Sequence, residues 1–288
     1  MKKLVIKLIY TLEMIKFSHS VFALPFALAA LVFAADGLPP LKTVGLIILA
    51  MVTARNTAMA FNRFADAKID AKNPRTANRH IPKGLLSRGF VLSFALINGA
   101  LFIYIASFFN PLAFKLSPMA LAIIYFYSYT KRWTHFTQLF LGLSLAIAPV
   151  GAWIALRGMI EAFPLLLGAA VLFWVAGFDI FYATQDFHFD KSEGLKSLVV
   201  RFGIARSLIV AKFFHVLSMV FFLAIGIVYQ LNTFYLTTVI LMGTFLAYEH
   251  HLVKPDDLSR VNTAFFTLNG TVGILYLAGT ILTVTTAS

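Results

Sequence analysis

Three polar residues at regular helical spacing form the first group that could carry out chemistry. Asn62, Asp66 and Asp70 recur every fourth residue, and on a helix this spacing stacks their side chains on one face. Pro74 follows, and we expect it to end or bend that helix because proline has no backbone N–H to donate. We call Asn62, Asp66 and Asp70 the first ladder.

A second group of residues has the same character. Asp179, Tyr182, Asp186 and Asp190 also fall on one face of a helix. Asp179 lies within an apolar run, where an ionisable side chain is unfavourable and by default indicates a functional site. We call these four residues the second ladder.

Carboxylates stacked at this spacing repel one another and need compensating positive charge. Mg²⁺ can supply that charge, because it takes one or two protein carboxylates and completes its shell with water and phosphate oxygens. The candidate metal ligands are Asn62, Asp66, Asp70, Asp186, Asp190 and, as an additional candidate, Asp179. The candidate catalytic residues are Asp66, Asp70, Asp186 and Asp190.

Basic residues follow both ladders and suit phosphate groups, Arg as a planar bidentate partner and Lys as a point charge. The candidates for diphosphate binding are Arg75, Arg79, Lys131, Lys191 and Lys196. A single Asp-x-x-x-Asp at a helix end is more often a solvated surface. Two such groups, each leaving an apolar segment and each followed by Arg or Lys, favour a diphosphate held between two metal-bearing clusters.

Three further residues, Tyr127, Arg55 and Asn56, could complete such a site together with Lys131. Tyr127 and Lys131 stand four residues apart at the end of an apolar segment, which alone is typical of an interfacial aromatic and a terminal cation. Beside the ladders, Lys131 could reach a diphosphate. Arg55 and Asn56 lie inside an apolar segment and should face the bundle interior. They either bind the carboxylate of an acceptor or hydrogen-bond between helices, and the sequence favours neither.

Several other kinds of site are absent from the sequence. The lack of cysteine excludes disulfides, thiolate catalysis and cysteine-ligated metals. The seven histidines show no metal-binding spacing, and we interpret His250-His251 as an exposed loop pair. Neither a Gly-rich phosphate loop nor a Ser-His-Asp set is evident.

The composition indicates that a membrane bundle holds these residues. The 288 residues are 60% hydrophobic and 12% charged, with a mean hydropathy of +0.84, whereas a soluble domain is about 45–50% apolar and about 25% charged. Apolar segments long enough to cross a bilayer are predicted at 17–35, 41–62, 90–109, 112–130, 136–156, 162–184, 207–229, 233–249 and 262–284. We therefore expect a single all-α, polytopic domain of nine transmembrane helices over 1–288, with pseudo-repeated halves at about 1–130 and 131–288.

The distribution of charge predicts an orientation. Nearly all of the 24 Lys and Arg residues fall at the N-terminus or in connections on the same side of the bundle. The exceptions are Lys42, Arg55, Lys115 and Arg157. This positive-inside bias predicts a cytoplasmic N-terminus and a site facing the cytoplasm in the inner membrane, and it explains the net charge of +12 without a nucleic-acid partner. Two connections on that side, 63–89 and 185–206, are predicted to be long.

The motifs resemble those of the UbiA family of intramembrane prenyltransferases, over nearly the whole chain. The matching elements are Asn62-x-x-x-Asp66-x-x-x-Asp70 with Arg75-Thr76-x-x-Arg79, Tyr182-x-x-x-Asp186-x-x-x-Asp190 with Gly194-x-Lys196-Ser197, and Tyr127-x-x-x-Lys131. The resemblance implies that the ladders bind Mg²⁺ and a prenyl diphosphate, that the basic residues clamp the diphosphate, and that an aromatic ring attacks the allylic carbon.

The details resemble most the branch that transfers a polyprenyl group to 4-hydroxybenzoate in ubiquinone-type quinone synthesis. The implied partners are polyprenyl diphosphate, an aromatic acid and the lipid bilayer, and no protein partner is indicated. Within this resemblance, acceptor binding or cation stabilisation is assigned to Arg55, Asn56, Tyr127 and Tyr182.

Two departures from the family pattern leave the acceptor open. Asn62-Arg63 stands where many members have Asn-Asp, and Arg79-His80-Ile81-Pro82 stands where Arg-Pro-Leu is usual. One alternative is prenylation of a dihydroxynaphthoate in menaquinone synthesis, and another is a haem, chlorin or glycerol-phosphate acceptor. A cation-coupled transporter is a different class, less favoured because transporter acids tend to lie near the bilayer midplane rather than at one face.

Overall fold

Helices account for nearly all of the structure. The computed structural model describes residues 2–15 and 22–287, and it contains no β-strand within them. The helices are α1 (Lys2–Ile15), α2 (Leu24–Ala35), α3 (Leu41–Lys72), α4 (Arg88–Ala106), α5 (Pro111–Thr130), α6 (Thr137–Arg157), α7 (Ala162–Ala183), α8 (Phe187–Ser192), α9 (Leu198–Val228), α10 (Thr233–Leu252) and α11 (Asn269–Ala287). A 3-10 turn (Thr184–Asp186) joins α7 to α8, and a π-helical turn (Thr263–Leu268) leads into α11.

The all-α membrane class is confirmed, while the count of nine spans stays a prediction. Each predicted segment overlaps one of the helices α2–α7 and α9–α11. Seven helices among the described residues are long and apolar enough to cross a membrane, and α2 and α10 are not among them. The first predicted segment, 17–35, begins in residues 17–21, which lie outside the described part, and its described helix starts at Leu24.

The first connection predicted to be long, 63–89, is helical only at its ends, as the predicted stop at Pro74 implies, whereas the second, 185–206, is mostly helical, which corrects the sequence interpretation there. Helix α3 continues to Lys72 and stops at Asn73, whose extended backbone is the conformation favoured before a proline. In the second connection, α8 and the start of α9 supply most of the residues. The apolar pattern placed the start of α9 too late because Arg201 and Arg206 interrupt the apolar run there.

The second ladder does not lie on one continuous α-helix. After Ala183 the chain tightens into the 3-10 turn that contains Asp186, and α8 then carries Asp190. A 3-10 turn has three residues per turn rather than 3.6, so Asp186 and Asp190 are rotated relative to a straight helical face. All the ladder residues nevertheless meet, as described below.

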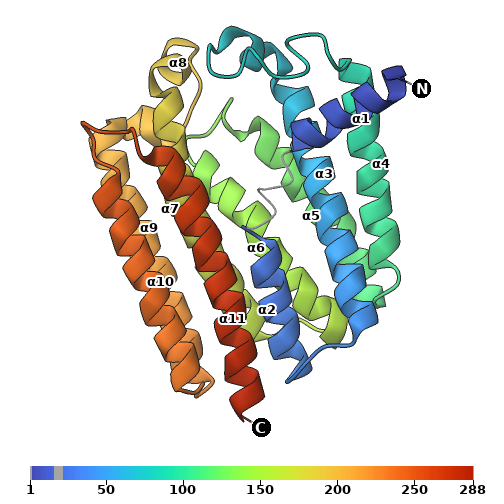
Figure 1. The fold of residues 1–288 in the computed structure, drawn as a ribbon, viewed down its shortest axis with the longest axis vertical. Coiled ribbons are helices and arrows are strands. Elements are labelled where there is room, and N and C mark those ends of the chain that lie inside the picture. The colour runs from blue at the N-terminus through green and yellow to red at the C-terminus, as the bar shows by residue number, and fades with distance from the viewer. Residues whose placement is uncertain (1, 16–21, 288) are drawn as a thin grey trace.

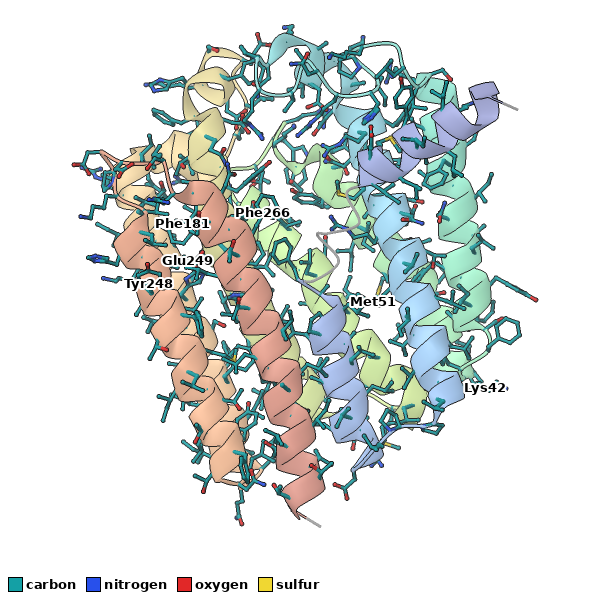
Figure 2. The ribbon with its side chains drawn as sticks, in the orientation of Figure 1. Lys42, Met51, Phe181, Tyr248, Glu249 and Phe266 are labelled. Carbon is teal, nitrogen blue, oxygen red and sulfur yellow. The ribbon has the colours of Figure 1, made fainter. Side chains whose placement is uncertain are left out.

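One end of the bundle carries most of the polar connections. Figure 1 shows α1, α8 and the connection after α3 at this end, and the C-terminus at the other. We call it the polar end. Lys42, one of the few basic residues predicted for the other side, lies at the opposite end of α3 (Figure 2). Helix α1, which the sequence analysis did not predict, crosses the polar end and buries Met14 and Ile15 against α3 and α4.

Helix α7 forms the centre of the second half, packed between α6 and α9. Its buried side chains include Leu167, Val171 and Trp174, none of which is exposed. The approach of α6 to α7 depends on Gly142, because a Cβ atom there would lie 2.3 Å from the carbonyl oxygen of Leu172. Only glycine allows two backbones this close.

We expect Gly142→Ala to destabilise the bundle, because the added methyl group meets rigid backbone rather than a mobile side chain. Overpacking of this kind costs about 1–3 kcal/mol, so the apparent Tm in detergent should fall by several degrees. Gly151→Ala on the same helix is the matched control, since a Cβ atom there meets nothing within 4 Å. Equal Tm values for the two variants would contradict the close-packing argument.

Candidate active site

Both ladders line one cavity of about 830 Å³ at and below the polar end. Asn62, Asp66 and Asp70 enter it from α3. The lining residues from the second ladder are Asp179, Tyr182, Asp186 and Asp190. Two segments more than a hundred residues apart in sequence therefore present their carboxylates to the same space.

The carboxylates of the first ladder are almost fully enclosed and heavily paired. The Asp66 carboxylate accepts hydrogen bonds from Lys131 Nζ at 2.5 Å and Arg132 Nη2 at 3.1 Å. The Asp70 carboxylate accepts one from Arg79 Nη1 at 2.7 Å. Asp66 is 3% exposed and Asp70 is 4% exposed, so these ion pairs are protected from screening by solvent.

The second ladder is joined to the connection after α3 through Arg75. Its guanidinium forms two hydrogen bonds with the Asp186 carboxylate, one of them from Nε at 2.8 Å. Its Nη1 also donates to the Tyr182 hydroxyl at 2.9 Å, and the guanidinium lies 5.0 Å from the centre of that ring. Asn73 Nδ2 donates to the same carboxylate at 2.9 Å.

The charge of Arg75 is stabilised by this arrangement. Partial burial lowers the pKa of its guanidinium, but the hydrogen bonds and charges of Asp186 and Tyr182 raise it more, so the pKa lies above its ordinary value. Arg75 therefore provides a permanent positive charge between the two ladders.

The two ladders differ in how completely the chain neutralises them. Three cations pair with the two carboxylates of the first ladder, whereas Arg75 alone pairs with the second. No ion pair to Asp179 or Asp190 forms among residues 2–15 and 22–287. The second ladder thus has the larger uncompensated negative charge.

The donor set of the cavity fits Mg²⁺. No three His, Asp or Glu side chains in the described part of the chain converge into a ready metal site. Mg²⁺ does not need one, because one or two carboxylates together with water and substrate phosphate oxygens complete its octahedral shell. The first ladder offers two carboxylates at the cavity and the second offers three, which satisfies that requirement.

The other predicted residues divide into those that line the cavity and those that do not. Tyr127, Lys131, Arg75, Arg79 and Arg55 line it. Lys191 and Lys196 do not: Lys191 is exposed on α8, and Lys196 Nζ donates to the backbone oxygen of Trp133 at 3.2 Å. The positions of Lys191 and Lys196 do not support the prediction that they bind the diphosphate.

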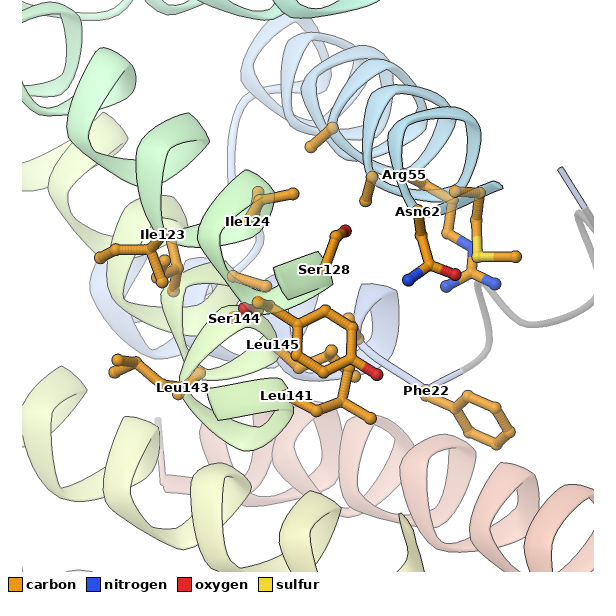
Figure 3. Close-up of a pocket in the computed structure, with 18 of the residues that line it drawn as sticks. Phe22, Arg55, Asn62, Ile123, Ile124, Ser128, Leu141, Leu143, Ser144 and Leu145 are labelled. Carbon is orange, nitrogen blue, oxygen red and sulfur yellow. The ribbon is translucent and has the colours of Figure 1, made fainter. Parts of the chain in front are cut away.

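Arg55 and Asn56, which the sequence treated alike, have different surroundings. Asn56 Nδ2 donates to Asn98 Oδ1 at 3.1 Å and so links α3 to α4. The Nε and Nη2 atoms of Arg55 are buried and have no hydrogen-bond partner among the described residues. Figure 3 shows Arg55 and Asn62 projecting from α3 towards the cavity. An unpaired buried guanidinium beside a cavity is suited to an anionic ligand.

Sequence reasoning missed three polar residues around the ladders. Asn73 bonds Asp186, and Arg132 bonds Asp66. Arg63 is 9% exposed and also lines the cavity. Arg132 and Asn73 adjoin Lys131 and Pro74, so proximity to motif residues was the available signal, but spacing alone did not reveal their partners.

The histidine interpretation needs a correction. His250 and His251 lie in the last turn of α10 rather than in a loop. His250 is partly buried, and its Nε2 lies 3.0 Å from Nδ1 of His215, which is 2% exposed. The apolar pattern placed the helix end too early because it stopped at the first polar residues.

Below the ladders the cavity wall becomes apolar. Side chains of α3, α5, α6 and α7 form it, including Ile124, Leu141 and Leu145 (Figure 3) and Ile154, together with Phe109 from the connection between α4 and α5. The cavity thus combines a charged head with a long apolar body, the shape needed by a ligand with a diphosphate head and a hydrocarbon tail.

Comparisons with known proteins agree with this geometry. Residues 23–271 match the model of the UbiA prenyltransferase family. The chain is 29% identical over 254 residues to the 4-hydroxybenzoate octaprenyltransferase of Vibrio atlanticus, covering 88% of this chain and 89% of that protein. It is 30% identical over 256 residues to the enzyme of the same name from Hydrogenovibrio crunogenus, covering 89% of each.

Two solved structures share the fold. A UbiA homolog from Aeropyrum pernix K1 superposes with a TM-score of 0.83 at 30% identity, covering 92% of this chain and 97% of that one. A UbiA homolog from Archaeoglobus fulgidus, bound to GPP and Mg²⁺, gives a TM-score of 0.74 at 20% identity, with 96% and 99% covered.

Proposed function

The chain belongs to the UbiA prenyltransferase family and is a transferase, and we propose that it transfers a polyprenyl group from polyprenyl diphosphate to the ring of 4-hydroxybenzoate in respiratory quinone synthesis. The observation that carries the proposal is the cavity, which has both ladders and their cations at one end and apolar walls below. The relatives named 4-hydroxybenzoate octaprenyltransferase support this acceptor.

The residues that would hold Mg²⁺ are Asp66 and Asp70 in the first ladder and Asp186 and Asp190 in the second, with Asn62 as a neutral oxygen ligand. When bound, Mg²⁺ supplies neutralisation of the charge that builds up on the diphosphate oxygens. The Archaeoglobus homolog was solved with GPP and Mg²⁺, which supports use of this ion.

Arg75, Arg79 and Lys131 bind the remaining diphosphate oxygens. Each already reaches a ladder carboxylate and lines the cavity, so a diphosphate seated between the ladders lies within reach of all three. As the allylic C–O bond breaks, the diphosphate leaves with its electron pair and the ring carbon bonds to the allylic carbon. The ring then loses a proton. Tyr127 and Tyr182 present π faces that stabilise the developing cation.

Arg55 binds the carboxylate of the aromatic acid. Its unpaired guanidinium lies on the same helix as the first ladder, about two turns below Asn62. A bidentate Arg–carboxylate pair would hold the ring between the diphosphate and the apolar body of the cavity. A dihydroxynaphthoate also carries a carboxylate, so Arg55 is compatible with the menaquinone-type acceptor, and the names of the relatives support 4-hydroxybenzoate.

The polar end faces the cytoplasm of the inner membrane in this proposal. The positive-inside bias supports that orientation, since most of the basic residues lie in the N-terminus and the connections at this end. The diphosphate head would then be presented from the cytoplasmic side while the tail stays in apolar surroundings.

Purified protein supplied with mixed prenyl diphosphates should prenylate 4-hydroxybenzoate, and mass spectrometry should show an added prenyl mass on that ring. Dihydroxynaphthoate, haem and chlorin acceptors belong in the same assay. A product on dihydroxynaphthoate alone would move the assignment to the menaquinone-type reaction, and uptake of a solute without any prenyl product would contradict the transferase reaction itself.

Asp66→Asn and Asp186→Asn each remove a negative charge with little change in shape. We expect each to lower kcat/KM at least about 100-fold, because charge neutralisation at a leaving group is worth several kcal/mol. A chelator should abolish transfer in the wild type, and added Mg²⁺ should restore it. Asp256→Asn, in an exposed connection, is the control and should keep the wild-type rate. Normal rates in either ladder variant would refute the site.

Arg55→Met should raise KM for 4-hydroxybenzoate about 10-fold or more and leave KM for the prenyl diphosphate nearly unchanged, because it removes one side of a charge-assisted pair. Arg157→Met, which alters an exposed ion pair with Glu161, is the control. As a second readout, phenol lacks the carboxylate, so Arg55→Met should reduce the preference for 4-hydroxybenzoate over phenol. An unchanged preference would mean that Arg55 does not bind the carboxylate.

A further inference from the structure

A second group of polar side chains is buried outside the cavity, between α7, α9, α10 and α11. Glu249 and Asn269 are 0% exposed and His215 is 2% exposed. None of the three lines the cavity. An ionisable side chain enclosed in an apolar bundle is unfavourable and by default indicates a function, and the proposed transfer reaction gives Glu249 no direct role.

Asn269 is the centre of this group, and its side chain is nearly saturated with hydrogen bonds. Its Oδ1 accepts from Trp174 Nε1 at 2.7 Å. Its Nδ2 donates to Glu249 Oε1 at 2.7 Å and to the backbone oxygen of Ala264 at 3.0 Å. One amide therefore ties α7, α10 and the segment before α11 together.

The bond to Ala264 is significant because that residue lies in the π-helical turn at 263–268. A π turn replaces the usual backbone pairing with i→i+5 bonds, is rare, and occurs frequently at functional sites. Asn269 is the first residue after this turn, and it supplies a side-chain donor to a carbonyl inside it. The side chain thereby helps to hold the irregular register of the turn.

The π turn carries an aromatic ring to the second ladder. Phe265 lies in the turn, lines the cavity, and has its ring centre 4.4 Å from that of Tyr182. Phe178 supports it at 5.2 Å and itself contacts Trp174 at 5.0 Å. Figure 2 shows Glu249 on α10 and Phe266 in the π turn that leads into α11.

Tyr182 is the side chain that joins this aromatic wall to the ion pairs of the site. Its hydroxyl accepts from Arg75, and Arg75 holds Asp186. Arg75 is the only cation paired with the second ladder in the described residues, and besides Asp186 itself its guanidinium is held by the Tyr182 hydroxyl and lies over the Tyr182 ring.

We propose that Asn269, held by Glu249, is a positioning residue for prenyl diphosphate binding: it fixes the π turn so that Phe265 packs on Tyr182 and keeps Arg75 at the second ladder. The inference rests on the proposed function for the identity of the ligand. It assigns a role to buried residues that neither contact the cavity nor belong to the ladders.

The expected signature is confined to the diphosphate substrate. Without the hydrogen bonds of the Asn269 side chain, the π turn is less well held. Phe265 then packs less firmly on Tyr182, and Tyr182 and Arg75 are no longer held in one position. Asn269→Leu should raise KM for the prenyl diphosphate, and the Kd for geranyl diphosphate with Mg²⁺, about 5- to 20-fold, while kcat at saturation and KM for the aromatic acid change less than about 3-fold.

A matched set of variants separates positioning from general destabilisation. Glu249→Gln keeps an oxygen acceptor for Asn269 and should bind diphosphate nearly as the wild type does. Thr283→Val is the control, because Thr283 is a buried polar residue of α11 whose hydroxyl bonds only within its own helix, to the backbone oxygen of Gly279. It should leave both constants unchanged.

A double-mutant cycle with Phe265→Leu tests the route. Phe265→Leu should weaken diphosphate binding by itself, and Asn269→Leu should add less than about 2-fold in that background, since coupled residues are not additive. If Asn269→Leu does not accumulate in the membrane, Phe265→Leu and Glu249→Leu carry the test, and both should weaken diphosphate binding.

The inference is overturned if the folded Asn269→Leu or Phe265→Leu variants bind geranyl diphosphate like the wild type, or if the two effects multiply fully. Binding is measured by titration calorimetry and does not require turnover. If the wild-type protein binds the diphosphate but prenylates no aromatic acid, the proposed function is refuted. The positioning role of Asn269 is then still tested by the same titration with geranyl diphosphate.

Discussion

Carboxylates gathered at the edge of an apolar bundle must be neutralised, and this requirement governs the arrangement of the site. Two unit charges 4 Å apart interact by about 4 kcal/mol where the effective dielectric constant is about 20, so unpaired aspartates would drive the ladders apart. The chain answers with Lys131, Arg132 and Arg79 at the first ladder and with Arg75 at the second. These cations are also the groups that suit a diphosphate, so stability and ligand binding draw on the same side chains.

The polar extensions of the helices follow from the same requirement. Because α3 continues to Lys72 and Asn73 then turns into an extended conformation, the connection after α3 reaches across the cavity to Asp186. The 3-10 turn before α8 brings Asp186 to meet it. A longer, unstructured connection would place the cations less reliably, because ordering each free residue costs about 1–2 kcal/mol of backbone entropy.

The sequence predicted the elements that depend on local patterns and missed those that depend on partners. Apolar runs located the long helices, and four-residue spacing located both ladders, because each signal lies within a short stretch of sequence, although the second ladder runs over α7, the 3-10 turn and α8 rather than one helix. The pairing of Arg132 with Asp66, the burial of Glu249 and the π turn before α11 depend on residues distant in sequence. Helix α1 was missed because its apolar residues are fewer than a bilayer span needs, although they suffice for one buried face.

The two halves of the site solve the positioning problem differently. In the first ladder, three cations pair with two buried carboxylates, and Arg132 also donates to backbone carbonyl oxygens. The second ladder has three carboxylates and one paired cation, Arg75, which bonds Asp186 and the Tyr182 hydroxyl beside an aromatic wall. Rigid packing, rather than several ion pairs, must then hold Arg75 in position. The saturated hydrogen bonds of Asn269 supply that rigidity at the π turn. The second ladder is supported by the uncharged side chains of Tyr182 and Phe265. These side chains do not neutralise its carboxylates, which therefore stay available to a metal-bound ligand.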